Sequence, residues 1–560
     1  MNFAMLQLNL VTGDICGNAA RIAKAARAAA VSGADLCITP AYALCGVGPQ
    51  HMLTADGFVE ACQNALHALA EELADGPSVL MGSPLAAFMP DDKRICNAVV
   101  LLKGGKLVVA ANMALNFNAQ ADVAPDMDQG MCCGMVTLFG WRLGVLLCDE
   151  RWEDALFWQM QKATAYNPLQ MLIIRGVDAL VHLGATPFTV GIHELREQRL
   201  SHVASRHHVH LFSSNLVGGN GSDVYHGRSL SFGPTGALLG RGRIFEEDYV
   251  LINTSTGGGP RYPERTSREE QLWGALCLGL RDYVRKSGFE GVLLGLSGGL
   301  DSAVVAAIAV DALGRENVLG LLLPSPWTSG ESTRYACELA DNLGIERMEL
   351  SIAPLMQAYA DTLAPALALP SKSARAGRDS TEENIQARIR GNLLMALANK
   401  YGLLLLNTSN KSEAAVGYST LYGDAAGALA VIGDVPKSRV YKLARWYNER
   451  RGSAGIPDGV IRRAPSAELR PGQLDTDSLP PYDVLDPLLA RITGEDSLPG
   501  FSADDGEQPD PALLGEVYGK MRAAEFKRRQ CPPALRVSRR AFGRDWRLPL
   551  VSRYSVPEKG

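Results

Sequence analysis

The segment Leu294-Gly-Leu-Ser-Gly-Gly-Leu-Asp-Ser-Ala303 decides the fold of the C-terminal half of this chain. Residues 291–296 are apolar and predict a buried strand, and the alanine-rich residues 303–313 predict a helix. A glycine-rich turn lies between them. The free N–H groups and the dipole of a helix N-terminus favour an anion, and glycines let the backbone approach it closely. The segment therefore predicts a phosphate-binding loop.

The polar residues of this turn indicate more than an ordinary strand-to-helix connection. Two glycines alone would fit such a connection, but here Ser297 and Ser302 flank the turn and Asp301 lies inside it. An acid would repel a bare phosphate, so Asp301 implies a bridging divalent cation. No lysine follows the second glycine, which excludes the Gly-x4-Gly-Lys-Ser/Thr loop.

The loop resembles the signature of the ATP pyrophosphatases, which cleave ATP to AMP and pyrophosphate while adenylating a substrate oxygen. That superfamily includes NAD synthetases, GMP synthetases, asparagine synthetases and tRNA-thiolating enzymes. The loop alone does not choose among them.

Length and composition restrict the number of domains and the class of protein. A chain of 560 residues should form two or more domains. Its net charge of −5 provides no basic surface for nucleic acid, and no apolar run approaches the length of a membrane span. Eleven cysteines, mostly inside apolar runs, fit reduced core thiols. We expect a soluble cytoplasmic enzyme with neither a nucleic-acid nor a membrane partner.

The pattern of elements predicts an α/β protein of two domains. A glycine- and proline-rich linker at residues 254–268 separates domains at 1–253 and 269–560. Before the linker, short paired strands with intervening helices predict a four-layer α-β-β-α sandwich. After it, predicted strands at 292–296, 318–323, 347–350 and 403–406 alternate with helices. This alternation predicts a doubly wound parallel sheet with its ligand crevice at the strand C-termini.

Three further segments select a family. They are Thr381-Glu-Glu-Asn-Ile-Gln-Ala-Arg-Ile-Arg-Gly391, the run from Leu403 through Asn407-Thr-Ser-Asn-Lys-Ser-Glu413 to Gly417, and the loop from Pro465-Ser-Ala-Glu-Leu-Arg-Pro to Pro480-Pro-Tyr-Asp483. Together they closely resemble the ATP-pyrophosphatase-type synthetase domain of the glutamine-dependent NAD synthetases. The resemblance runs from about residue 269 to the end of the chain.

The resemblance implies a role for each matching residue. The ATP phosphates would be held by Ser297, Gly298, Gly299, Asp301 and Ser302, and Thr408 would also contact ATP. Asp301 and Glu413 would bind Mg²⁺. Deamido-NAD⁺ would be held by Asn384, Arg388 and Asp424, with Lys437 binding phosphate and Lys527 closing over the site. The chemistry explains the cations, because charge gathers on the α-phosphate when the nicotinate carboxylate attacks it.

Residues 1 to about 250 resemble the nitrilase-like amidase domain that supplies ammonia in this family. The matching stretches include Gln7-Leu-Asn-Leu-Val-Thr-Gly-Asp-Ile-Cys-Gly-Asn18, Gly144-Val-Leu-Leu-Cys-Asp-Glu-Arg-Trp152 and His193-Glu-Leu-Arg-Glu197. The family chemistry uses a cysteine nucleophile, a glutamate base and a lysine. Cys148 matches the nucleophile, but Ala41 and Met113 occupy the other two positions. We therefore expect a structural remnant without glutaminase activity.

These observations leave three hypotheses for the function of the chain. The leading one is a homo-oligomeric enzyme that amidates deamido-NAD⁺ with ATP, Mg²⁺ and free ammonia. The second keeps the enzyme and lets glutamine hydrolysis survive through unrecognised groups. The third is a non-catalytic scaffold, against which the intact loop at residues 297–302 argues. A preference for nicotinate mononucleotide over the dinucleotide stays open.

Overall fold

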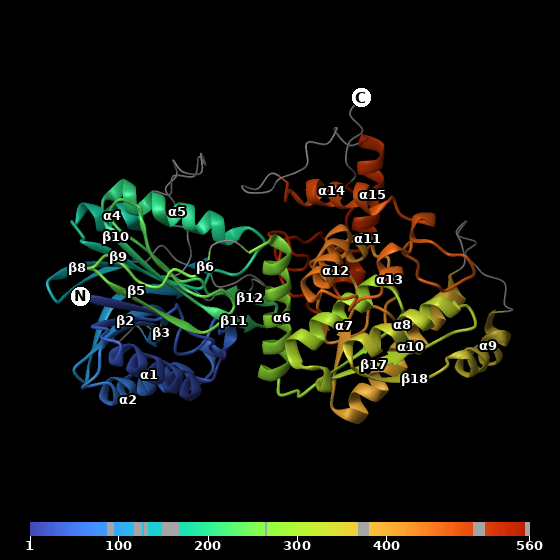
Figure 1. Ribbon diagram of the computed structural model, residues 1–560, viewed down its shortest axis with the longest axis horizontal. Coiled ribbons are helices and arrows are strands. Elements are labelled where there is room, and N and C mark those ends of the chain that lie inside the picture. The colour runs from blue at the N-terminus through green and yellow to red at the C-terminus, as the bar shows by residue number, and fades with distance from the viewer. Residues whose placement is uncertain are drawn as a thin grey trace. The chain divides into compact units, whose positions relative to one another are not determined.

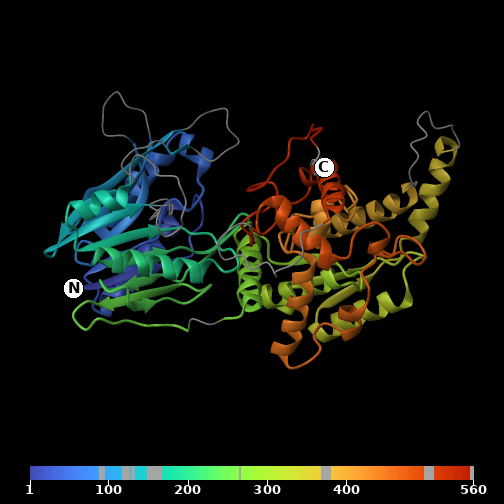
Figure 2. The same cartoon turned by 90° about the horizontal axis from the view of Figure 1, so that it is seen from above.

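The computed structural model describes residues 1–86, 95–116, 126–127, 133–147, 167–263, 266–367, 380–496 and 510–554. Contacts divide the chain into two compact units. The first unit consists of Met1–Asn220 and Val224–Thr266, and the second of Gly221–Asp223 and Ser267–Gly560. Figures 1 and 2 show both units in two views.

Two sheets form the centre of the first unit. The seven-stranded sheet has the order β15 (Asp248–Asn253), β1 (Asn2–Gln7), β2 (Leu36–Ile38), β3 (Ser78–Ala86), β4 (Ile95–Lys103), β5 (Lys106–Asn116) and β6 (Asp126–Met127). The six-stranded sheet has the order β14 (Leu238–Arg241), β13 (Leu230–Phe232), β10 (His210–Asn215), β9 (Ala179–Gly184), β8 (Trp141–Leu147) and β7 (Cys133–Leu138). A separate ribbon pairs β11 (Val217–Asn220) with β12 (Asp223–His226).

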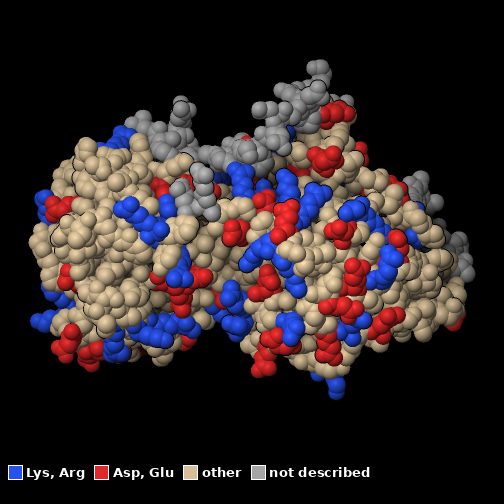
Figure 3. Space-filling view, viewed as in Figure 1, with Lys and Arg blue, Asp and Glu red and all other residues tan. Residues whose placement is uncertain are grey.

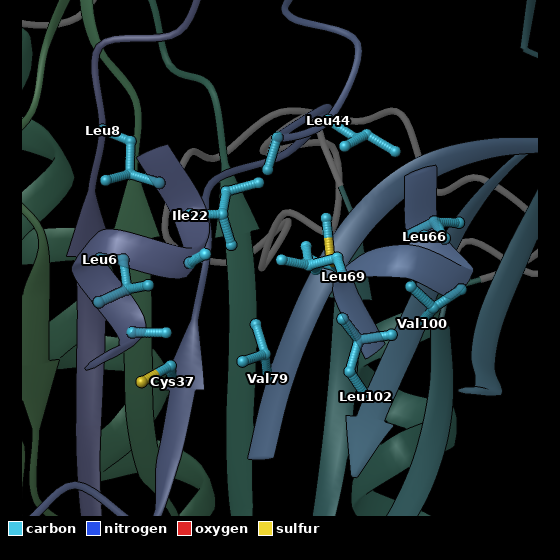
Figure 4. Close-up of a cluster of buried hydrophobic side chains, with 14 of the residues drawn as sticks. Leu6, Leu8, Ile22, Cys37, Leu44, Leu66, Leu69, Val79, Val100 and Leu102 are labelled. Atoms are coloured by element: carbon cyan, nitrogen blue, oxygen red, sulfur yellow. The ribbon is translucent and has the colours of Figure 1, made fainter. Parts of the chain in front are cut away.

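Strand β1 shows how the layers are built. Successive side chains of a strand point to opposite faces. Phe3 and Met5 pack into a cluster shared with Leu143 and Val181 of the other sheet. The alternate residues Ala4 and Leu6 enter a second cluster, on the side of helices α1 (Ile15–Val31) and α2 (Phe58–Glu72). Figure 4 shows part of this second cluster, including Leu6, Ile22 of α1 and Leu66 of α2.

The opposite outer face is covered in the same way. Helices α4 (Pro168–Ile174) and α5 (Ile192–His207) bury Leu172 and Leu200 against residues of the six-stranded sheet. Figure 1 shows these two helices on the side of the sheets away from α1 and α2. The predicted α-β-β-α sandwich is therefore confirmed.

The second unit is built on a five-stranded, wholly parallel sheet. Its order is β18 (Glu346–Glu349), β17 (Val318–Leu322), β16 (Val292–Gly295), β19 (Leu404–Asn407) and β20 (Leu429–Ala430). The chain begins in the middle at β16, adds β17 and β18 on one side, and crosses to β19 and β20 on the other. The predicted doubly wound sheet is confirmed, and its switch point lies between β16 and β19.

Helix α7 (Leu300–Leu313) is the most enclosed of the described helices of this unit. It is apolar over most of its circumference, and eleven of its residues are buried. Helix α6 (Arg268–Lys286) packs on it, and Trp273 Nε1 donates a hydrogen bond to Asp311 (2.9 Å). The remaining helices are α8 (Gly330–Leu343), α9 (Ala353–Leu367), α10 (Thr381–Tyr401), α11 (Lys411–Val416), α12 (Lys437–Arg451), α13 (Asp458–Arg462), α14 (Tyr482–Thr493), α15 (Pro511–Ala523) and α16 (Glu525–Arg528).

Basic and acidic side chains are interspersed on the face that Figure 3 draws. The cysteines in the described ranges have free thiols, and burial raises the pKa of Cys37 to about 12. Within those ranges no helix combines the length and apolarity needed to cross a bilayer.

Candidate active site

The loop after β16 has the geometry of an anion cradle. Gly298 has a φ of 74°, and a Cβ at this position would lie 2.1 Å from the carbonyl oxygen of Ser332. Only glycine fits such a position. The hydroxyls of Ser297 and Ser302 lie 3.0 Å apart, and Gly299 N donates to Ser297 Oγ (3.1 Å). These bonds fix the loop in front of the first turn of α7.

A pocket of about 320 Å³ opens beside this loop at the carboxyl ends of the central strands. Its lining includes the whole loop, Thr408 after β19, and Ala387 and Gly391 of α10. Residues 463–469 form a further wall. The pocket therefore lies at the switch point, where open α/β sheets bind their ligands.

A lysine and two carboxylates meet on the floor of this pocket. Lys437 begins α12, and its ammonium contacts Asp301 Oδ2 and lies 3.3 Å from Glu413 Oε1. The ammonium also lies 5.4 Å from the centre of the Tyr482 ring. The lysine side chain is only 3% exposed. The structure thus brings together three of the predicted residues, from α7, α11 and α12.

Electrostatics couple these groups. Burial raises the pKa of Glu413, although Lys437 opposes the shift. Burial alone would lower the pKa of Lys437, but Asp301 and Glu413 together raise it, so the lysine stays charged. Asp475 also lines the pocket, and burial raises its pKa while a hydrogen bond from Tyr482 (2.8 Å) opposes the shift.

Two residues that the sequence analysis missed organise this cluster. Asn410 caps α11, donates from Nδ2 to Asp301 (3.1 Å) and accepts from Glu413 N (3.0 Å). It therefore fixes the two carboxylates relative to each other. The pattern Asn410-Lys-Ser-Glu413 is a capping-box spacing and could have signalled this role. Asp475 carried no such signal.

The residues present fit a divalent cation completed by phosphate oxygens. Asp301 and Glu413 supply two carboxylates, and the ammonium of Lys437 stands in for a cation between them. Mg²⁺ is typically held by one or two carboxylates together with substrate phosphates and water. No group of three or more His, Cys, Asp or Glu arranged for a metal occurs in the part of the chain that the structure describes.

The residues predicted to hold the dinucleotide gather around residues 417–424. Thr420 Oγ1 donates to Asn384 Oδ1 (2.8 Å), and Arg388 Nε donates to the carbonyl of Leu421 (3.2 Å). Asp424 accepts from Thr420 N (2.6 Å) and lines the pocket. Burial raises the pKa of Asp424 to about 6.

Lys527 approaches the same loop from α16. Its ammonium donates to the carbonyls of Gly417 (2.8 Å) and Ser419 (2.6 Å). Burial lowers the pKa of Lys527, although Asp424 opposes the shift. Asn384, Arg388 and Lys527 therefore all contact the same loop. None of the three belongs to the lining of the pocket.

The predicted amidase positions are only partly described. Ala41 is fully buried in the apolar cluster between the two sheets, with Ile38 and Leu80. Met113 lies in β5 with its backbone paired to Asn97, and its side chain is outside the described part. Cys148 also lies outside the described residues.

Two family models match the chain, one in each of the two compact units. The family model for carbon-nitrogen hydrolase matches residues 2–256, and the model for NAD synthase matches residues 272–531. A glutamine-dependent NAD(+) synthetase from Synechocystis sp. is 42% identical over 98% of each chain. The chain belongs to the glutamine-dependent NAD(+) synthetases. A second member, from Thermotoga maritima, is 37% identical over 100% of this chain and 99% of its own.

Solved structures of the glutamine-dependent NAD(+) synthetases resemble both units. The enzyme from Acinetobacter baumannii, in complex with adenosine diphosphate, has a TM-score of 0.74 and is 30% identical, covering 100% of this chain and 99% of its own. That from Cytophaga hutchinsonii has a TM-score of 0.77 at 20% identity, over 99% and 98% of the chains, which supports the fold alone.

Proposed function

We propose that the second unit converts deamido-NAD⁺ to NAD⁺ by ATP-dependent amidation. The observation that carries the proposal is the meeting of Asp301, Glu413 and Lys437 beneath the Ser-Gly-Gly loop at the switch point. The names of the relatives support the reaction, and the adenosine diphosphate complex of the Acinetobacter baumannii enzyme supports a nucleotide site.

The proposed reaction has two steps. A carboxylate oxygen of the nicotinate attacks the α-phosphorus of ATP, and pyrophosphate leaves. Ammonia then attacks the activated carbonyl carbon and loses a proton, and AMP leaves with the electron pair of the broken C–O bond. The product is the nicotinamide amide.

The residues of the pocket have distinct proposed roles in the first step. The loop residues Ser297, Gly298, Gly299 and Ser302, together with Thr408, hold ATP. Lys437 offsets the charge that grows on the attacked phosphate. Mg²⁺ held by Asp301 and Glu413 would supply further charge neutralisation when bound. Asn384, Arg388 and Asp424 hold the dinucleotide, and Lys527 closes over it.

The proposed division of the chain follows from these roles. The nitrilase-like domain comprises residues 1–253, the linker 254–268 and the synthetase domain 269–560. The enzyme acts as a homo-oligomer. An assay of AMP and pyrophosphate release on adding deamido-NAD⁺ with ammonia tests the activity, and absence of both products would favour a non-catalytic scaffold.

The source of nitrogen has two candidates. The names of the relatives favour glutamine, and the similarity to them extends over the amidase half of the chain. Ala41 and Met113 favour free ammonia, because neither can act as a base or carry a positive charge. Removal of a general base alone typically lowers a rate by about 10² to 10⁴-fold. We propose ammonia as the direct substrate and keep glutamine as the alternative.

A side-by-side assay with glutamine and with ammonium chloride decides between them. If ammonia is the substrate, the wild type responds to glutamine only through contaminating ammonia, and Cys148→Ala matches it on both nitrogen sources. A glutamine-driven rate that rivals the ammonium-driven rate, and is lost in Cys148→Ala, would establish the glutamine alternative.

A further inference from the structure

The ammonium of Lys437 occupies the place of a cation between two carboxylates. It contacts Asp301 and lies 3.3 Å from Glu413, and all three side chains are largely shielded from water. The side chain of Asn410 donates a hydrogen bond to the other oxygen of Asp301. The backbone N–H of Asn410 donates to the second oxygen of Glu413 (3.4 Å). Both carboxylates are therefore already occupied by partners within the protein.

The backbone of Lys437 is fixed, so its side chain is the part that can move. Its N–H donates to Ser412 Oγ (2.9 Å), and that hydroxyl in turn bonds to Asp486. Helix α12 packs against the enclosed helix α7. The long, flexible lysine stem can reorient its ammonium while this anchor stays in place.

A free divalent cation would have to displace this ammonium or bind beside it. Displacement without a new anion leaves a buried lysine unpaired, which is unfavourable. Binding beside it brings like charges together in surroundings of low polarity. ATP removes both obstacles, because its phosphates offer a new partner to Lys437 and further oxygens to the cation.

We propose, building on the proposed function, that Lys437 holds the cation position in the nucleotide-free enzyme, so that a divalent cation enters only together with ATP. Pyrophosphate release then returns the lysine to Asp301 and Glu413. The two carboxylates alone do not form a binding site for the free metal while Lys437 lies between them.

Titration of the full-length protein with Mn²⁺, followed by electron paramagnetic resonance without nucleotide, tests the proposal. The wild type should leave Mn²⁺ free at concentrations where Lys437→Gln binds one ion per chain, with an affinity difference of roughly 30-fold or more. Lys437→Arg keeps the charge and should resemble the wild type. Adding α,β-methylene ATP should give the wild type its Mn²⁺ ion.

Two controls sharpen the test. Lys527→Gln removes a lysine whose ammonium bonds carbonyls rather than Asp301, and it should gain no Mn²⁺ site. Asp301→Asn added to Lys437→Gln should abolish the gain. Lys437→Met has a similar length and no charge, and it replaces the glutamine variant if that variant does not fold.

Two results would overturn the proposal. One is a wild type that binds Mn²⁺ without nucleotide within about threefold of Lys437→Gln. The other is a folded Lys437→Gln or Lys437→Met protein that binds the ATP analogue and still gains no site. NAD⁺ formation by the wild type is measured separately. A failure of the proposed function can therefore be distinguished from a failure of the proposal that Lys437 holds the cation position.

Discussion

The side-chain amide of Asn410 donates a hydrogen bond to Asp301 across 109 residues of sequence, at 3.1 Å. The same side chain accepts the N–H of Glu413 and caps α11. One neutral and fully buried residue thus positions both carboxylates that are proposed to bind Mg²⁺. Its contribution to activity should be separable from its contribution to stability.

Asn410→Ala should lose both contributions. The lost cap should lower the free energy of unfolding by about 1 kcal/mol. The misplaced carboxylates should lower kcat by roughly 10²-fold. Asn410→Ser is the matched control, because serine can cap the helix but is too short to reach Asp301. Denaturant unfolding and steady-state kinetics check the pair, and a fully active Asn410→Ser would rule out the positioning role.

Asp301→Asn should stop adenylation while leaving the fold intact. The substitution keeps the size of the side chain and removes the charge that pairs with Lys437 and is proposed to bind Mg²⁺. The rate of pyrophosphate exchange into ATP should fall by about 10³-fold or more. Exchange near the wild-type rate with Mg²⁺ present would show that the metal assignment is wrong.

Arg388→Ala should act through the dinucleotide rather than through ATP. A hydrogen bond from a charged group contributes about 1.5–3 kcal/mol, so the KM for deamido-NAD⁺ should rise roughly 10- to 100-fold. The KM for ATP should change little. Arg334→Ala removes an exposed arginine and serves as the control. Equal increases for both substrates in Arg388→Ala would instead indicate a general distortion of the crevice.

Gly298→Ala should disrupt the phosphate loop although it adds a single methyl group. The residue has a φ of 74°, and the new Cβ would lie 2.1 Å from a backbone oxygen of α8. We expect a loss of about 1–3 kcal/mol in stability and loss of ATP binding. Gly515→Ala, where a Cβ meets nothing within 4 Å, is the control. Calorimetry with ATP checks both, and normal binding by Gly298→Ala would refute the close packing.

The first unit should be sensitive to acid through His182. Burial lowers the pKa of this histidine to about 3, and Arg196 and Arg199 add to the shift. The unfolded chain takes up the proton near pH 6.5 and the folded one only near 3. The contribution of His182 to stability is therefore fully present above pH 6.5. It is lost as the pH falls from 6.5 towards 3, by at most about 1.4 kcal/mol per pH unit.

Thermal unfolding from pH 7 to pH 5 measures this effect. His182→Asn should flatten the fall in melting temperature that the wild type shows. An unchanged slope in this variant would assign the acid sensitivity to other groups.

The centre of the parallel sheet could be predicted because β16, β17 and β19 are buried on both faces. Continuous apolar runs predicted strands at residues 292–296 and 403–406, and the structure has β16 at Val292–Gly295 and β19 at Leu404–Asn407. The helix predicted at 303–313 begins earlier, at Leu300. Its first turn is formed by residues of the polar loop, which an apolar pattern does not mark.

The contacts within the site were harder to predict. Lys437 and Asp301 are 136 residues apart, and their meeting depends on where two crossovers place α12 and α7. No local sequence pattern predicts the contact between residues so far apart. Asn410 has a recognisable capping pattern, but no pattern in the sequence predicts its hydrogen bond to Asp301. Asp475 begins a 3-10 helix of only three residues, Asp475–Asp477, which is too short for a periodic pattern to predict.

Every described residue that lines the ligand pocket comes from residues 295–475, entirely within the second unit. The described lining of this pocket therefore includes no residue of the nitrilase-like half of the chain. A change of nitrogen supply needs no compensating substitution in the pocket, so the two halves can diverge at different rates.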